Sequence, residues 1–162
     1  MDMTVDLKSA LTRWALALEK AAPELNELDA RLGDGDLGVT LQKCAKNSLV
    51  AIAQESQTPQ QILRDVSQAC ADASGSSFGT LLASGFFSSA KWLEDGHEID
   101  RNSLSDLLQH IVMKLSARGG AYLGDKTMLD SLHAISVAIG NASSQDDIKT
   151  LALNAANQVL ED

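Results

Sequence analysis

Three aspartates between residues 29 and 38 have the types and the spacing of a metal-binding group. Asp29 ends a helical pattern, and Asp34 and Asp36 follow five and seven residues later on a glycine-rich turn. Glycine permits the tight backbone path that turns the later carboxylates back toward Asp29. Converging carboxylates repel one another unless a hard cation lies among them, and oxygen-only ligation by few protein groups suits Mg²⁺ completed by phosphate oxygens and water. The stretch predicts a magnesium site that holds phosphates.

The same residues are compatible with two alternatives. An EF-hand calcium loop fits poorly, because no glutamate occupies the bidentate last position of such a loop. A solvated helix C-terminus followed by ordinary Asp-Gly turns accounts for the aspartates without any metal. The spacing alone leaves the magnesium site and the solvated turn open.

Two further loops concentrate glycine, serine, threonine and aspartate. Residues 73–80 place hydroxyl groups where a helix begins, and the free N–H groups and positive dipole of a helix N-terminus attract phosphate. Residues 119–130 include Gly-Asp-Lys-Thr at 124–127, which is not a Walker motif because no predicted strand precedes it. A capping turn accounts for each loop without a ligand, and Asp125 or Thr127 is the expected cap of the second.

The composition restricts the class of protein. A chain of 162 residues with 44% apolar and 4% aromatic residues predicts one helical domain over residues 1–162. The formal charge of −9 opposes binding to nucleic acid or to an anionic membrane, and no apolar run could span a bilayer. The N-terminus is acidic where a signal peptide would be basic, which favours a cytoplasmic location.

The remaining reactive and aromatic side chains indicate structural roles. Cys44 and Cys70 fall within helical patterns and are expected to be buried and reduced. The three histidines have no Ser, Cys or Asp partner nearby in the sequence, which disfavours a hydrolase triad. Trp14 and Trp92 are interpreted as packing residues rather than as a platform for stacking bases.

Apolar residues at helical spacing predict an all-α, antiparallel up-and-down bundle of about eight helices. Pro23 is expected to open a separate second helix, and Ser143 or Ser144 to cap the last one. Connections after the second, fourth and sixth helices would lie at the same end, so the three loops could meet there. The first five expected helices are 5–20, 23–32, 38–54, 59–73 and 78–93. A sixth begins after Asn102 or Ser103 and ends near Gly119, a seventh includes Met128 to Ile139, and the eighth runs to the C-terminus.

The three loops together resemble the motifs of the DhaL or DAK2 domain of dihydroxyacetone kinases. The resemblance covers nearly the whole chain, and its motifs are Leu25–Gly38, Ala73–Thr80 and Gly124–Asp130. It implies a helical barrel that binds ADP or ATP at one end, with two Mg²⁺ ions between the phosphates and Asp29, Asp34 and Asp36. It also implies nucleotide contacts on the phosphates at Leu37, Gly38, Val39, Thr40, Ala73 and Ser74, and in the nucleoside pocket at Gly119 and Met128.

In this family the sugar-like substrate lies on a separate K subunit or domain, which holds the ketone through a histidine. The resemblance therefore implies a phosphotransferase that acts only with a K-type partner, and it is compatible with a homodimer. Leu37 stands where members recharged by a phosphocarrier commonly have histidine, which favours exchangeable ATP. The chain ends at Asp162, where family members usually continue with a further segment and helix, so we expect a trimmed sequence or a degenerate relative.

Three functional hypotheses follow from the sequence. The first is a nucleotide- and Mg²⁺-binding subunit that delivers a phosphoryl group to a ketone on a K-type subunit. The second is a non-catalytic relative that senses nucleotide or serves as a scaffold. The third is a purely structural helical bundle.

Overall fold

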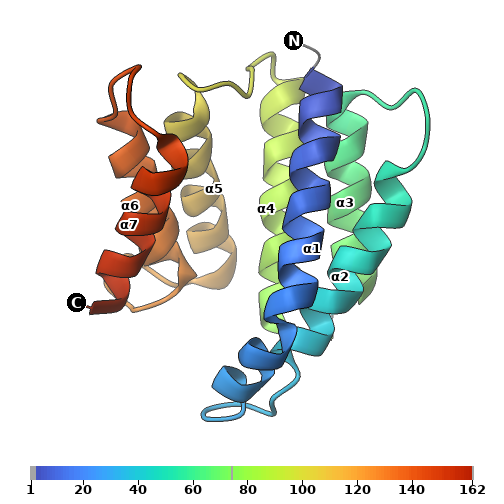
Figure 1. The fold of residues 1–162 in the computed structure, drawn as a ribbon, viewed down its shortest axis with the longest axis vertical. Coiled ribbons are helices and arrows are strands. Elements are labelled where there is room, and N and C mark those ends of the chain that lie inside the picture. Colours follow the sequence, from blue (N-terminus) through green and yellow to red (C-terminus); the bar gives the residue numbers. More distant parts are fainter. Residues whose placement is uncertain (1–2, 74, 162) are drawn as a thin grey trace. The chain divides into compact units, whose positions relative to one another are not determined.

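The computed structural model describes residues 3–73 and 75–161, and only the backbone of residues 3–5. Over these residues the chain forms seven α-helices and no strand, which confirms the all-α prediction (Figure 1). Ser74, a predicted phosphate contact, lies outside the described residues. The helices are α1 (Met3–Asp29), α2 (Leu37–Ile52), α3 (Pro59–Ala73), α4 (Ser77–Glu94), α5 (Leu104–Gly119), α6 (Met128–Gly140) and α7 (Ile148–Glu161).

Pro23 lies inside α1, so the separate second helix predicted from residue 23 is wrong. A proline in a helix removes one hydrogen bond and bends the axis, but residues on both sides can keep helical geometry. Pro23 and Glu19, whose carbonyl loses its partner, are both exposed, so water can satisfy that carbonyl. The ribbon of α1 changes direction toward its C-terminal end (Figure 1).

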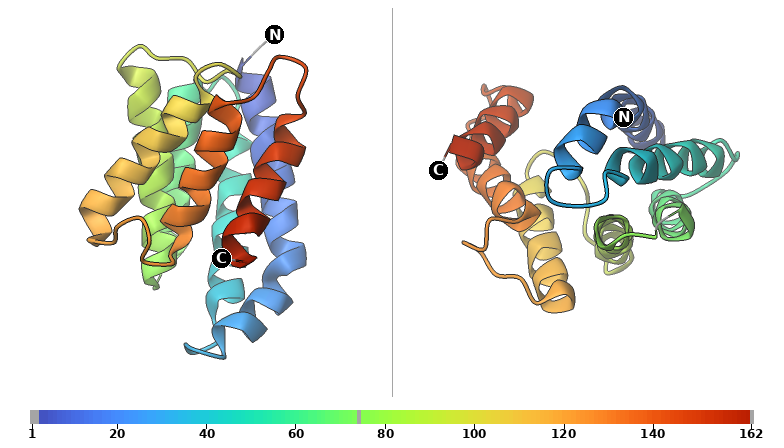
Figure 2. Two further views of the ribbon diagram at one scale, coloured as in Figure 1. Left: turned by 90° about the vertical axis from the view of Figure 1, so that its left-hand side faces the viewer. Right: turned by 90° about the horizontal axis from the view of Figure 1, so that it is seen from below.

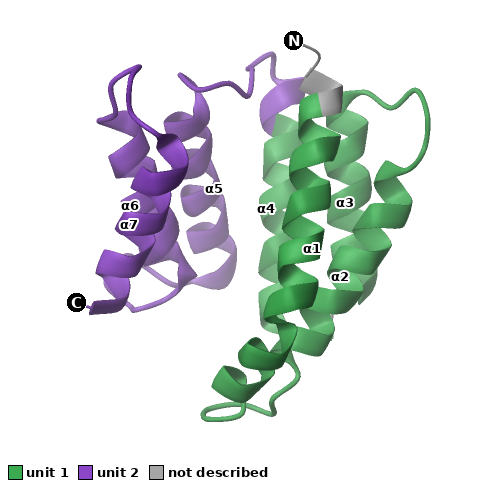
Figure 3. Cartoon of the chain, viewed as in Figure 1, with its two compact units in different colours: residues 1–91 green, residues 92–162 purple. Residues whose placement is uncertain are grey.

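The contacts divide the chain into two compact units, residues 1–91 and 92–162 (Figure 3). Unit 1 contains α1, α2, α3 and most of α4, and unit 2 contains α5, α6 and α7. The expectation that residues 1–162 act as a single domain stays a prediction.

In unit 1, α2 packs against both α1 and α3. Ser67 of α3 donates a hydrogen bond to the carbonyl of Ala83 in α4 at 2.7 Å. Trp14 of α1 and Phe86 of α4 pack edge to face at 5.2 Å, which confirms the packing role predicted for Trp14. The buried apolar cluster comprises Leu11, Cys44, Ile52, Ile62, Val66, Cys70 and Ala83.

The two cysteines belong to this cluster. Both are buried and free, as predicted, and the Cys44 thiol contacts the carbonyl of Cys70 at 3.8 Å. The Cys44 contact and burial raise the pKa of the Cys70 thiol, so its reactive thiolate is disfavoured. The pair fills space between α2 and α3.

The connections of unit 1 alternate between its two ends. The α1–α2 and α3–α4 connections lie at one end, and the α2–α3 connection lies at the other (Figures 1 and 2). This confirms the up-and-down order for α1 to α4. It also brings the first two predicted loops to the same end of unit 1.

In unit 2, α6 packs against both α5 and α7. The buried Ser105 hydroxyl of α5 donates to the carbonyl of Ser136 in α6 at 2.8 Å. Helix α7 begins at Ile148, so the cap predicted at Ser143 or Ser144 is wrong. The carboxylate of Asp147 accepts from the N–H of Lys149 at 3.2 Å and thus caps this helix closer to its start.

Trp92 packs with two histidines at the start of unit 2. Its ring stacks on His97 at 4.0 Å and lies 5.3 Å from the ring of His110. Its indole N–H donates to the carbonyl of Glu98 at 3.0 Å. These contacts confirm the packing role predicted for Trp92.

None of the helices in the described part of the chain combines the length and apolar character needed to cross a membrane.

The buried position of Ile62 provides a test of the unit 1 core. Its side chain is 0% exposed, so Ile62→Ala should lower the free energy of unfolding by about 2–5 kcal/mol through lost burial and a residual cavity. Val50 is 70% exposed, so Val50→Ala should change it by no more than about 0.5 kcal/mol. Urea denaturation measures both, and equal effects would contradict the assigned core.

Candidate metal and phosphate site

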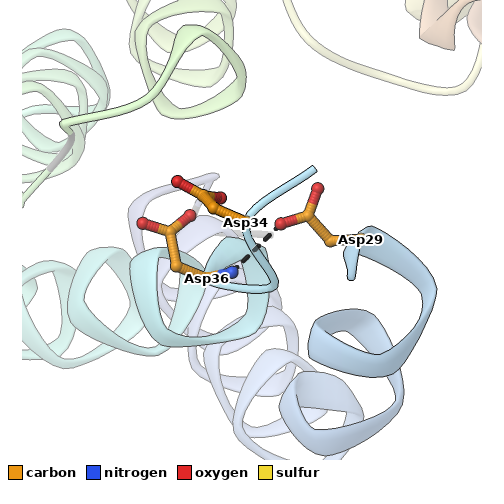
Figure 4. Close-up of side chains that lie close together, drawn as sticks. All are labelled: Asp29, Asp34 and Asp36. Atoms are coloured by element: carbon orange, nitrogen blue, oxygen red, sulfur yellow. Dashed lines mark hydrogen bonds between the residues drawn. The ribbon is translucent and has the colours of Figure 1, made fainter. Parts of the chain in front are cut away.

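The three predicted aspartates come together where α1 ends and α2 begins. Asp29 is the last residue of α1, Asp34 lies on the connecting turn, and Asp36 directly precedes α2. One carboxylate oxygen from each lies within 4.8 Å of those of the other two (Figure 4). Asp34 and Asp36 are exposed and Asp29 is half-buried, so a cation could reach them from solvent.

Two side chains of α1 fix the start of α2 against the end of α1. Asp29 Oδ2 accepts hydrogen bonds from the backbone N–H groups of Asp36 at 3.0 Å and Leu37 at 3.3 Å. Asn26 Oδ1 accepts from the N–H of Val39 at 3.2 Å. These bonds satisfy N–H groups that the first turn of a helix leaves without partners. One turn of α1 thus caps α2 and positions the carboxylates.

The role of Asn26 was not predicted from the sequence. Asn26 stands three residues before Asp29, so both side chains lie on the same side of α1. That spacing was a usable signal, because an amide beside a carboxylate near a helix end is a common capping group.

Two glycines make this junction sterically feasible. Gly35 has φ = +76°, a left-handed conformation that other residues rarely adopt. Gly38 is buried against α1, and a Cβ atom there would lie 2.0 Å from the carbonyl oxygen of Ala22. Only a residue without a side chain allows α2 to begin so close to the backbone of α1.

The aspartates concentrate negative charge on this turn. The pKa of Asp36 is raised, first by the charge of Asp34 and then by partial desolvation, by its contact with Asp34 and by Asp29, while Lys43 opposes the rise. Asp36 is the N-cap residue of α2, yet its side chain makes no capping hydrogen bond. Its carboxylate instead lies beside that of Asp34 (Figure 4). A cation between the carboxylates would relieve this repulsion.

The predicted phosphate contacts of unit 1 lie at the same end as the aspartates. Leu37 is half-buried, Val39 is 42% exposed and Thr40 is buried, all in the first turn of α2. Ala73 is the last residue of α3, and its side chain packs on the apolar cluster. The two predicted loops of unit 1 therefore border a common region.

The turn before α4 has the capping geometry that was the alternative interpretation. The hydroxyl of Ser76 accepts from the N–H of Gly79 at 3.3 Å, and the carbonyl of Ser76 accepts from the N–H of Thr80 at 3.2 Å. Ser76 therefore caps the N-terminus of α4, which begins at Ser77.

The predicted residues Gly119 and Met128 belong to unit 2. Gly119 ends α5 and Met128 begins α6, so each flanks the same connection. Thr127 is the cap: its side chain accepts from the N–H of Leu129 at 3.2 Å, while Asp130 accepts from the N–H of Thr127 at 2.9 Å.

Asp130 also organises the backbone that precedes α6. Its other carboxylate oxygen accepts from the N–H of Gly124 at 2.6 Å. The hydrogen bonds from Gly124 and Thr127 lower the pKa of Asp130, so it stays ionised as a structural residue. The Gly-Asp-Lys-Thr segment is thus a closed capping loop.

Comparison with known proteins gives one consistent relationship. The family model described as the DAK2 domain matches residues 31–162, which include Asp34, Asp36 and every other predicted site residue except Asp29. The chain is 25% identical over 156 residues to the ADP-binding subunit DhaL of PEP-dependent dihydroxyacetone kinase 1 from Listeria innocua. It is 28% identical over 153 residues to D-erythrulose kinase from Mycolicibacterium smegmatis.

The chain spans different shares of these proteins. The alignments cover 93% of this chain in both cases, but 78% of the Listeria subunit and 26% of the erythrulose kinase. The dihydroxyacetone kinase of C. freundii, solved with AMP-PNP and Mg²⁺, has the same fold over 97% of this chain and 28% of its own, with a TM-score of 0.80 and 24% identity.

The close approach at Gly38 generates a stability prediction. Gly38→Ala must push α2 away from α1 and should lower the free energy of unfolding by about 1–3 kcal/mol, measured by urea denaturation. Gly75→Ala is the control, because a Cβ atom there meets nothing within 4 Å. Equal stability of the two variants would refute the assigned packing.

The raised pKa of Asp36 predicts that its charge destabilises the metal-free protein. The folded protein loses stability as the pH rises from 3.8, the ordinary pKa of an aspartate, through the raised pKa of Asp36. Asp36→Asn should therefore raise the melting temperature at pH 7 in EDTA, and the gain should disappear in acid, where the wild-type side chain is neutral too.

Glu55→Gln is the matched control for Asp36→Asn. It removes the same charge from an exposed residue of the α2–α3 connection, at the other end of unit 1. An equal rise in melting temperature for both variants would show that net charge, rather than the cluster, is responsible.

Proposed function

This chain belongs to the DAK2 domain family, and we propose that it is the nucleotide-binding subunit of a ketose kinase. In this proposal it binds Mg²⁺ with ATP or ADP and delivers the terminal phosphoryl group to a ketone held by a separate K-type subunit. The observation that carries the proposal is the convergence of Asp29, Asp34 and Asp36 within 4.8 Å at the start of α2.

The donor set fits Mg²⁺. All the candidate ligand atoms are carboxylate oxygens, which hard cations prefer, and the exposed side of the cluster leaves room for water and phosphate. We propose two Mg²⁺ ions, held by Asp29, Asp34 and Asp36. Bound there, Mg²⁺ would neutralise charge on the transferring phosphoryl group.

The protein groups would then position the nucleotide. The N-termini of α2 and α4 lie at one end of unit 1, and helix N-termini favour anions. We assign the phosphates to the backbone around Leu37, Gly38, Val39, Thr40, Ala73 and Ser74. We assign the nucleoside to Gly119 and Met128, which flank the α5–α6 connection.

The relatives supply the substrate class of the proposal. The Listeria subunit is named as ADP-binding and the M. smegmatis protein as a D-erythrulose kinase, and both names refer to kinases of small ketoses. The proposal requires no nucleophile from this chain, because phosphoryl transfer depends on positioning and charge stabilisation. Leu37 in place of histidine favours exchangeable ATP over recharging of bound ADP. We place the activity in the cytoplasm.

Metal-dependent nucleotide binding tests the proposal. Calorimetry with ADP should show binding in Mg²⁺ that is lost in EDTA and in the variant that combines Asp34→Ala and Asp36→Ala. ADP at a hundred times its dissociation constant should stabilise the wild-type fold by about 2.7 kcal/mol. Affinity should fall as the pH is lowered through the raised pKa of Asp36, because protons compete with Mg²⁺.

Glu24→Ala combined with Glu27→Ala is the control, since it removes two exposed charges from the last turns of α1. Binding that ignores Mg²⁺, or that survives in the aspartate double variant, would refute the proposal. The alternative function, a nucleotide-sensing or scaffold module, predicts the same binding. Reconstitution with a K-type subunit and dihydroxyacetone separates the two, because the alternative yields no phosphorylated ketose.

A further inference from the structure

Two leucines beside the acidic cluster are exposed to solvent. Leu32 is 101% exposed and Leu28 is 47% exposed, four residues apart at the end of α1. Leu28 lies in the last turn of α1, and Leu32 lies on the turn that follows this helix. We call Leu28 and Leu32 the leucine pair.

The backbone holds the leucine pair in place. The N–H of Leu32 donates to the carbonyl of Asp29 at 3.0 Å, and the N–H of Arg31 donates to that of Leu28 at 3.3 Å. The side chain of Leu32 is therefore presented to solvent by a hydrogen-bonded turn. A single exposed leucine is ordinary, but this one stands between two of the clustered aspartates in the sequence.

The α1–α2 connection also projects from unit 1. It extends beyond the adjoining ends of α3 and α4 in both side views (Figures 1 and 2). Residues 24–36 contain five acidic residues and one basic residue, Arg31. The projection is thus a convex, acidic knob with aliphatic side chains on its surface.

This shape and charge define the surface that would receive it. A convex apolar group binds best in a concave apolar pocket, and acidic surroundings match a basic rim. A protein that brings an acceptor hydroxyl to phosphates held by the aspartates must contact the residues that border them. Leu28 directly precedes Asp29, and Leu32 lies two residues before Asp34, so the leucine pair flanks them in the sequence.

Resting on the proposed function, we propose that the leucine pair docks into an apolar pocket with a basic rim on the protein subunit that holds the phosphoryl acceptor. In this role Leu32 sets the affinity for that subunit and leaves nucleotide binding unchanged. The aspartates supply the long-range attraction, and the leucines supply the buried contact.

The test uses the full chain, Mg–ATP and a K-type subunit loaded with dihydroxyacetone. Leu32→Ser should raise the K-subunit concentration needed for half-maximal rate by at least about ten-fold, as expected for a central apolar contact. The maximal rate and the dissociation constant of Mg–ADP should stay at wild-type values. Leu32→Met should restore most of the affinity, and added NaCl should weaken docking of the wild-type chain.

Val50→Ser is the matched control, because Val50 is 70% exposed near the opposite end of α2 and should leave half-saturation unchanged. Wild-type half-saturation in Leu32→Ser would overturn the docking proposal, as would an altered Mg–ADP affinity in that variant. A half-saturating K-subunit concentration that does not change with added NaCl would contradict the proposed basic rim. A wild-type chain that transfers no phosphoryl group would instead overturn the proposed function itself.

Discussion

The hydrogen bonds from the first turn of α2 to the side chains at the end of α1 are the contacts on which the candidate site depends. Asp29 uses one carboxylate oxygen to accept from Asp36 and Leu37, and its backbone carbonyl accepts from Leu32 and Gly33. Asp29 is therefore the last residue of α1, caps the first turn of α2 and keeps a second carboxylate oxygen that a cation could bind. Asn26 repeats the capping one turn earlier. Gly38 permits the close approach of α2 to α1 that accompanies the bonds from the start of α2.

This junction holds three carboxylates together, and the nearby Lys43 offsets only part of their repulsion on Asp36. Lys43 lowers the pKa of Asp36, but Asp34 and Asp29 each act on it more strongly in the opposite direction. Local stability is thus reduced where ligand binding would be gained, a compromise common at functional sites. The buried cluster around Ile62 and Val66 provides stability that offsets this local repulsion.

The structure separates side chains that cap a helix from a carboxylate that stays available for a ligand. Ser76 and Thr127 proved to be caps, and their side chains are occupied by backbone N–H groups of α4 and α6. Asp36 occupies an equivalent position before α2, but its side chain makes no such bond. This difference distinguishes a carboxylate that remains available for a metal from side chains that complete a helix. Composition and spacing do not reveal it, because serine, threonine and aspartate are all good caps.

The sequence by itself determined the helical class, the bounds of α2 to α6 within a few residues, and the three aspartates, because helical periodicity and glycine-flanked turns are local properties. Pro23 and Asp147 led to errors at helix ends, since a proline can bend a helix without ending it and neighbouring polar residues compete as caps. Only the tertiary structure decided that the carboxylates converge within 4.8 Å, that Asn26 caps α2 and that Gly38 touches α1. Each of these features depends on how α1 and α2 pack. Packing brings together residues that are far apart in the sequence, and the sequence spacing alone does not give their distance in space.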